Sequence, residues 1–278
     1  MSDISETLSN LLSESRRFFP PVELAINANV KIESYQEASE DRLAFWAKQA
    51  KRLQWDKPWT QVLDWSDAPF ARWFVDGRLN IAVNCVDRHV AAGNGSRVAY
   101  YWEGEPGDTR VITYADLHRE VAKAANALES LGVAAGDRVA IYMPMIPEAV
   151  FSLLACARIG AVHTVIFSGF SASAIADRVN DTGAKLLITA DGGWRRGKVI
   201  ERKANVDKAL EGTPSVQSVI VVKRCGNPIN MVEGRDVWWK DAWVGAPNTH
   251  KAKAFDAEFI ELARSVYIRN DERAGGDA

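Results

Sequence analysis

The segment with the clearest capacity for chemistry is a basic loop at 191–198. Three cations, Arg195, Arg196 and Lys198, surround Gly197, and two further glycines precede them. Guanidinium groups bind phosphate oxygens in a bidentate manner, and the N-terminus of a helix favours anions. We expect the loop to follow a buried strand and to open a helix over 198–210, so the pattern predicts phosphate binding. On these residues alone, a solvated basic loop explains the pattern equally well.

The same loop formally matches a P-loop, because Gly192, Gly197 and Lys198 satisfy G-x-x-x-x-G-K. Val199 stands where a P-loop needs a Ser or Thr hydroxyl for magnesium. The two arginines would also lie inside the cradle in which backbone N–H groups should face the phosphates. We therefore reject a P-loop nucleotide hydrolase and retain phosphate binding.

A second loop, at 167–171, follows another predicted strand. It consists of Phe167, Ser168, Gly169, Phe170 and Ser171. Gly169 lets a ligand approach the backbone closely, and Ser171 can cap the next helix. Ligands of doubly wound sheets bind at such loops, outside the carboxyl ends of strands. Composition alone favours a simple glycine turn with an ordinary helix cap.

Patterns typical of nucleophilic or metal-dependent catalysis are absent from the sequence. The four histidines are dispersed without metal-ligand spacing, and no G-x-S-x-G motif occurs. The three cysteines form no C-x-x-C pair, which predicts a reducing, cytoplasmic setting rather than a disulfide framework. We assign no catalytic residue and no metal ligand in this chain.

Strands and helices alternate from residue 97 onward. Residues 106–108 are typical of a hairpin turn between 98–102 and 110–113, and Thr113 with Asp116 forms a capping-box pattern for the next helix. Further strands are predicted at 139–143, 162–167, 185–190 and 216–223, and further helices at 147–158, 171–179 and 198–210. The apolar strands predict burial on both faces, hence an α/β fold with a mostly parallel sheet and helices on both faces.

The composition excludes some partners. The 278 residues are 47% hydrophobic and 25% charged, with a formal net charge of -2. This is the balance of a soluble globular protein, with no bulk charge to recruit nucleic acid or an anionic membrane. The most apolar stretch, 149–167, contains Arg158, Gly160 and His163, and is expected to be a helix followed by a strand rather than a membrane span.

Several strings together resemble the AMP-forming acetyl-CoA synthetases, within the adenylate-forming superfamily. Their order and spacing carry the resemblance: 73–80 (WFVDGRLN), 84–89 (NCVDRH), 112–117 (ITYADL), 143–148 (MPMIPE), 160–163 (GAVH), 167–171 (FSGFS), 195–198 (RRGK), 205–207 (NVD) and 233–239 (EGRDVWW). The resemblance implies a helical, Trp-rich N-terminal extension over 1–90, an incomplete α/β part of the AMP-binding domain over 91–254, and a divergent charged tail over 255–278.

The resemblance also implies an activity. Acetate attacks the α-phosphate of ATP, and the thiol of CoA then displaces AMP from the acyl-adenylate. In this family, the loop matching Arg195, Arg196, Gly197 and Lys198 contacts the phosphates of the nucleotide end of CoA, and the loop matching Phe167, Ser168 and Gly169 lies beside it. The family commonly has Gly at position 168 and Arg at position 198, where Lys keeps the charge but loses the fork.

The family continues into a Ser/Thr/Gly-rich loop that holds the phosphates of ATP, and we find no such loop in this sequence. We therefore expect the ATP and Mg²⁺ sites and the catalytic lysine to lie outside this chain. A truncated, frame-shifted or split gene would produce this pattern, the last with a separately encoded C-terminal half. The chain alone is expected to be inactive. The alternative is a non-catalytic module that binds CoA or another partner, and the sequence does not distinguish acetate from propionate.

Overall fold

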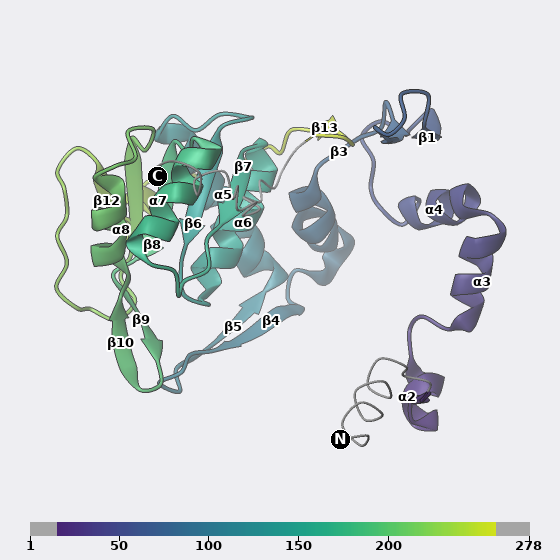
Figure 1. The fold of residues 1–278 in the computed structure, drawn as a ribbon, viewed down its shortest axis with the longest axis horizontal. Helices are drawn as coiled ribbons and strands as arrows, with labels where there is room; N and C mark the ends of the chain where they lie inside the picture. Colours follow the sequence, from purple (N-terminus) through teal and green to yellow (C-terminus); the bar gives the residue numbers. More distant parts are fainter. Residues whose placement is uncertain (1–15, 260–278) are drawn as a thin grey trace, which may run out of the picture. The chain divides into compact units, whose positions relative to one another are not determined.

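The computed structural model describes residues 16–259, and the chain divides into two compact units, 1–52 and 53–278. The described part of the first unit consists of helices α2 (Val22–Asn27), α3 (Ile32–Glu40) and α4 (Arg42–Ala50) (Figure 1). Asp41 caps α4 by accepting a hydrogen bond from the Ala44 N–H at 2.9 Å. An ion pair of 2.6 Å between Lys48 and Glu37 links α4 to α3.

The second unit is built on a parallel five-stranded sheet; the sequence predicted the parallel arrangement and four of the strands, but not the strand at 236–238. Its strand order is β12-β11-β8-β6-β7, and every neighbouring pair runs parallel. The strands are β6 (Arg138–Tyr142), β7 (Val162–Val165), β8 (Leu186–Ala190), β11 (Ser218–Val222) and β12 (Asp236–Trp238). The helices of this unit are α5 (Tyr114–Ser130), α6 (Pro147–Ile159), α7 (Ala172–Thr182), α8 (Arg202–Leu210) and α9 (Trp239–Trp243).

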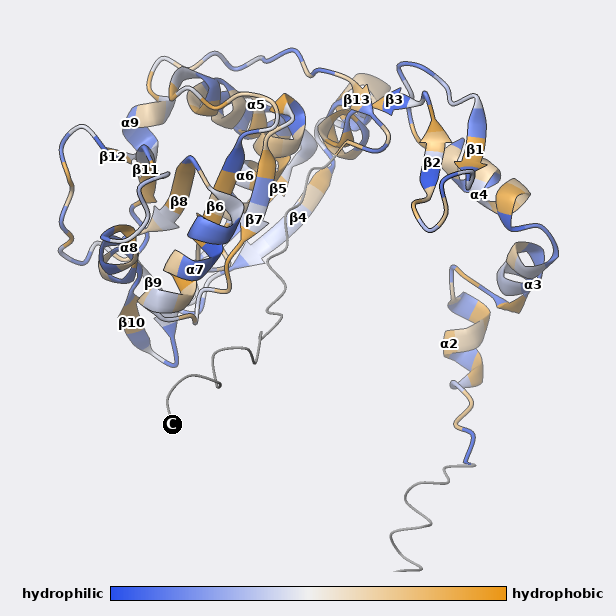
Figure 2. Cartoon of the chain, turned by 45° about the horizontal axis from the view of Figure 1, so that its top comes forward, coloured by the Kyte–Doolittle hydropathy of each residue, from blue (hydrophilic) through white to orange (hydrophobic). Residues whose placement is uncertain are grey.

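Both faces of the sheet are buried, and successive residues of a strand belong to different cores. Ile188 of β8 packs in a cluster with residues of α5, α6 and α9, whereas its neighbour Leu187 packs with residues of α7 and α8. This two-sided burial explains the continuous apolar strands of the sequence. Most of the central strand β8 accordingly has the hydrophobic colour in Figure 2.

The predicted hairpin before α5 is confirmed. Strands β4 (Val98–Glu103) and β5 (Thr109–Thr113) pair antiparallel. Thr113 then caps α5: its hydroxyl accepts from the Asp116 N–H at 3.1 Å, and the Asp116 carboxylate accepts from the Thr113 N–H at 3.2 Å. This reciprocal pair is the predicted capping box.

Residues 53–94 differ from the helical extension expected over 1–90. They contain β1 (Gln61–Asp64) paired antiparallel with β2 (Arg72–Val75), the short β3 (Arg78–Leu79), and two π-helical turns at Val83–Asp87 and Val90–Asn94. Trp55, Trp59 and Phe74 pack together with ring centroids 5.0–5.6 Å apart. Short strands held by such an aromatic cluster leave no long alternating pattern in the sequence.

The start of the predicted tail is an ordered part of this unit. Strand β13 (Phe255–Asp256) pairs antiparallel with β3. The Phe255 ring lies so close to Gly160 that a Cβ there would overlap it. Residues 260–278 of the expected tail lie outside the described residues.

The apolar stretch at 149–167 is divided between α6 and β7, as predicted. Within residues 16–259, no helix combines the length and the apolar character that crossing a bilayer requires.

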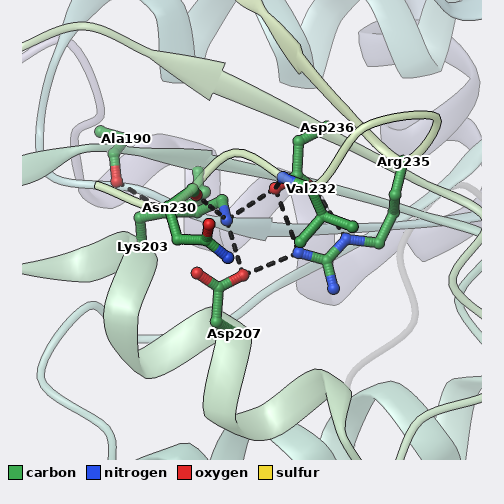
Figure 3. A network of polar contacts seen from close by, with 8 residues as sticks. Ala190, Lys203, Asp207, Asn230, Val232, Arg235 and Asp236 are labelled. Atoms are coloured by element: carbon green, nitrogen blue, oxygen red, sulfur yellow. Dashed lines mark hydrogen bonds and ion pairs between the residues drawn. The ribbon is translucent and has the colours of Figure 1, made fainter.

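A buried ion network holds α8 against the loop that precedes β12 (Figure 3). Lys203 of α8 is fully buried and lies 2.6 Å from Asp207 and 2.7 Å from Asp236, and it donates to the Asn230 carbonyl at 2.9 Å. Arg235 bridges both carboxylates at 2.6–2.7 Å. Burial raises the pKa of Asp236, but hydrogen bonds from Arg235 and Lys203 outweigh it and hold that pKa below its ordinary value.

We expect Lys203→Met to lower the free energy of unfolding by about 3 kcal/mol, because two carboxylates then share a single cation. Lys208→Met, on the exposed side of the same helix, should change it by less than about 0.5 kcal/mol. Equilibrium urea unfolding compares the two variants. Equal stability of both would contradict a structural role for the network.

Candidate functional site

A pocket of about 310 Å³ lies where the sheet strands end at their carboxyl edge. Ligands of parallel α/β sheets bind at this edge. Residues from the segments after β6, β7, β8 and β11 and from the β4–β5 hairpin line it: Trp102, Glu103, Gly104, Glu105, Pro144, Met145, Ile146, Phe167, Ser168, Trp194, Arg195, Arg202 and Arg224.

The basic loop is a β-hairpin, and the expected helix at Lys198 is a wrong prediction. Strand β9 (Gly192–Arg195) pairs antiparallel with β10 (Lys198–Glu201), and α8 begins only at Arg202. Arg196 and Gly197 form the two-residue turn with φ of 53° and 73°, and positive φ at both positions is what a type I′ hairpin turn requires. No helix N-terminus therefore lies directly behind Arg195 and Lys198.

The hairpin is anchored by the buried carboxylate of Asp191, directly after β8. Its Oδ1 accepts from the N–H groups of Gly192 at 2.7 Å, Arg224 at 2.7 Å and Cys225 at 3.0 Å, and its Oδ2 accepts from the Gly226 N–H at 2.7 Å. The Asp191 carbonyl accepts from the N–H of Arg202, the first residue of α8, at 3.2 Å. One residue thus fixes the hairpin, α8 and the segment after β11 relative to one another.

The tip of the hairpin also contacts the β4–β5 turn. The Gly197 N–H donates to the Glu105 carboxylate at 2.6 Å, and the two hairpin ends lie side by side in Figure 1. This contact joins the hairpin tip to Glu105, which lines the pocket.

Tyr142 of β6 contacts the backbone of the loop at 167–171. The fully buried Tyr142 hydroxyl lies 3.2 Å from the carbonyl oxygens of both Ser168 and Phe170, to which it can donate. Ser171 caps α7 by accepting from the Ala174 N–H at 3.4 Å, as predicted. The loop is therefore fixed at both ends, and the Phe167 side chain remains 61% exposed.

The structure brings the two predicted loops together. Phe167, Ser168 and Arg195 line the same pocket, and a Cβ added to Gly169 would lie 3.4 Å from the Arg195 guanidinium. Arg196, Gly197 and Lys198 are exposed at the hairpin tip and are not among the lining residues. None of the three cations Arg195, Arg196 and Lys198 has a carboxylate partner among residues 16–259.

Two further cations, Arg202 and Arg224, line the pocket, and the sequence did not indicate them. Arg224 is paired bidentately with Asp108 at 2.6 and 2.8 Å and stacks over Trp102, and these hydrogen bonds raise its pKa. Arg202 is only 4% exposed. Burial lowers the pKa of Arg202, and the nearby charge of Arg195 lowers it further. The sequence predicts Arg202 within the helix at 198–210, and a cation in a helix gives no signal of a site.

The pocket offers binding groups rather than a reactive one. Aromatic and apolar side chains lie beside cations, which suits a ring that carries phosphate. Burial raises the pKa of the neighbouring Cys225 thiol, so it is not an activated thiolate. Across the described part of the chain, no group of three or more His, Cys, Asp or Glu could hold a metal ion, and no step is assigned to Mg²⁺ here.

Two family models match the chain. One, described as AMP-binding enzyme, matches residues 87–260, which is more than half of the chain; the other, described as acetyl-coenzyme A synthetase N-terminus, matches residues 32–85.

Three relatives are each described as acetyl-coenzyme A synthetase. The protein of Streptomyces avermitilis is 59% identical over 254 residues, 91% of this chain and 39% of its own length. The protein of Mycolicibacterium smegmatis is 60% identical, and the match covers 86% of this chain and 26% of the relative's own length. The protein of Deinococcus radiodurans is 48% identical, and the match covers 93% of this chain and 40% of the relative's own length. These matches confirm the resemblance found in the sequence, and the chain spans less than half the length of each relative.

We expect Asp191→Asn to lower the free energy of unfolding by about 1–3 kcal/mol. The amide oxygen can replace Oδ1, but its NH₂ group would face the Gly226 N–H and leave that donor unpaired. Asp177→Asn, on an exposed face of α7, is the matched control and should have almost no effect. Thermal and urea unfolding measure both, and an Asp191→Asn variant as stable as wild type would contradict this anchoring role.

Proposed function

We propose that this chain, which belongs to the AMP-binding enzyme family, carries the CoA-binding part of an AMP-forming acetate–CoA ligase. The reaction converts ATP, acetate and CoA to acetyl-CoA, AMP and pyrophosphate. One observation carries the proposal: the 167–169 loop and Arg195, distant in sequence, line one cationic and aromatic pocket. The curated relatives described as acetyl-coenzyme A synthetases support the reaction class.

The nucleotide end of CoA fits the chemistry of this pocket. Its adenine ring can pack against the exposed Phe167 and the Trp194 side chain, both of which line the pocket. Its phosphates require cations, and Arg195 has no carboxylate competing for its guanidinium in the described part of the chain. Arg196 and Lys198 at the hairpin tip add positive charge that attracts the anionic ligand as it approaches.

The proposed contribution to the reaction is positioning. Holding the nucleotide end of CoA in a fixed pocket restricts where its thiol can reach, and this converts a bimolecular attack on the acyl-adenylate into an effectively unimolecular one. Gly169 lets the Phe167 ring lie against the loop backbone beside Arg195, because a Cβ there would be 2.6 Å from that ring. None of the residues assigned here forms or breaks a bond.

Three further elements belong to the proposal. ATP and Mg²⁺ are bound by residues outside this chain, such as a separately encoded C-terminal half. The reaction takes place in the cytoplasm, which the three free cysteines support. The acyl substrate is a short-chain carboxylate, acetate or propionate.

We expect Arg195→Ala to weaken CoA binding roughly tenfold, because it removes a charge-assisted contact that is partly screened by solvent. Lys208→Ala, an exposed cation on α8, is the control and should leave the affinity unchanged. Isothermal titration of CoA into the 278-residue chain gives both values. Equal affinities for all three proteins would remove Arg195 from the site.

We expect Lys198→Ala to weaken CoA binding less than Arg195→Ala does, because Lys198 lies outside the pocket lining, and to leave any ATP affinity unchanged. A P-loop would show the reverse, with ATP affinity lost on removal of its lysine. Titration of both ligands into the same variant separates the two readings.

We expect the 278-residue chain alone to release no pyrophosphate from ATP with acetate, because it contains no loop of the kind that holds ATP phosphates. A coupled pyrophosphate assay with a no-protein blank measures this. CoA binding without turnover agrees with the proposal and with a non-catalytic CoA-binding module, and restored turnover on adding a C-terminal half selects the ligase. Acetate-dependent pyrophosphate release by the chain alone would contradict the expectation.

A further inference from the structure

Arg202 differs from the other buried cations of the described residues. Arg158 is paired with Asp87 at 2.8 Å, and Lys203 is paired with Asp207 and Asp236. Arg202 is as buried as these two, yet no carboxylate within residues 16–259 forms an ion pair with it. Its contacts are a long hydrogen bond of 3.5 Å to the Tyr142 hydroxyl and the Tyr142 ring, 5.8 Å away. Its buried Nε has no hydrogen-bond partner.

A buried guanidinium without an anion is costly, because removal from water is not offset by a paired charge. Arginine cannot relieve this cost by losing its proton, since its pKa stays far above neutral pH. The neutral tyrosine hydroxyl offers only weak compensation. The arrangement is therefore incomplete without an anion.

The same pocket holds Arg202 and Arg195, and neither of the two carboxylates that line it, Glu103 and Glu105, forms an ion pair with them among the described residues. Both residues line it, and Arg195 acts electrostatically on Arg202. The third arginine, Arg224, is already neutralised by Asp108. Glu105 is engaged by the Gly197 N–H at the hairpin tip. Gly193 lets the guanidinium lie against the hairpin backbone, since a Cβ there would be 3.3 Å from Nε.

We propose that Arg202 and Arg195 together bind a phosphate monoester, with Arg202 as the buried residue that selects it. Two neighbouring cations suit a monoester, which carries a charge of about -1.5 to -2 at pH 7. Each phosphate of a diphosphate diester carries only a single negative charge, so it neutralises the two guanidinium groups less well. Resting on the proposed function, the inference assigns Arg202 to the 3′-phosphate of CoA and makes it the residue that distinguishes CoA from dephospho-CoA, which lacks that group.

The test compares wild type with Arg202→Met, which keeps the side-chain length and removes the charge. CoA and dephospho-CoA are titrated into each protein, and the melting temperature is measured without ligand. We expect Arg202→Met to bind CoA at least tenfold more weakly and dephospho-CoA within twofold of wild type. We also expect its ligand-free melting temperature to rise, because an uncompensated charge has been removed; a purely structural arginine would lower it.

Arg202→Lys provides a second variant if Arg202→Met does not fold. It keeps the charge without the fork, and its ratio of CoA to dephospho-CoA affinity should fall between those of wild type and Arg202→Met. A wild-type ratio in either folded variant would overturn the assignment.

Failure of the inference is distinguishable from failure of the proposed function. If wild type binds no CoA, the proposed function is wrong, and adenosine 3′-monophosphate then tests Arg202 by itself. A rise in melting temperature with this monoester in wild type but not in Arg202→Met keeps the phosphate site. An equal rise in both, or none in wild type, removes it.

Discussion

The geometry of the site depends on one buried carboxylate, that of Asp191. Its two oxygens accept four backbone N–H groups, from Gly192 on one side and from 224–226 on the other. A carboxylate satisfied in this way holds three chain segments at the end of β8 without needing a cation. Arg195 lies on the hairpin that follows it, Arg202 begins the helix whose N–H it accepts through its carbonyl, and Arg224 donates to it directly. The positions of all three pocket arginines are thus set by one residue that does not itself line the pocket.

The second constraint is the two-sided burial of the sheet. Tyr142 stands at the carboxyl end of β6, on the face covered by α7 and α8, and its hydroxyl meets both the 167–170 loop and Arg202. The side chain of a buried sheet residue, Tyr142, therefore helps to position two parts of the pocket. The Lys203 network links α8 to the edge strand β12 and so supports the first residue of the helix, Arg202. The exposed Arg195 and the buried Arg202 are thus both positioned by buried residues.

The sequence was informative where burial produces a run of apolar residues and where a helix begins with a capping box. Strands β6, β8 and β11 follow from continuous apolar runs, and the start of α5 follows from Thr113 and Asp116. It was misleading at Lys198, because a two-residue turn with positive φ at Arg196 is an unusual use of arginine. Arg202 and Asp191 gave no signal, since burial without a partner and convergence of N–H groups from 33–35 residues away are properties of the folded chain. The positions of the two loops after β7 and β8 were predictable, but the depth at which each cation is buried was not.

The central claim is that the nucleotide end of CoA occupies the pocket between the 167–169 loop and the β9–β10 hairpin. Site-resolved hydrogen exchange of the wild-type chain, with and without saturating CoA, tests it most directly. The account predicts slower exchange of amides within 167–170 and 192–202, with α3 and α4 unchanged. Slowed exchange confined to other segments, or no change at saturation, would contradict it.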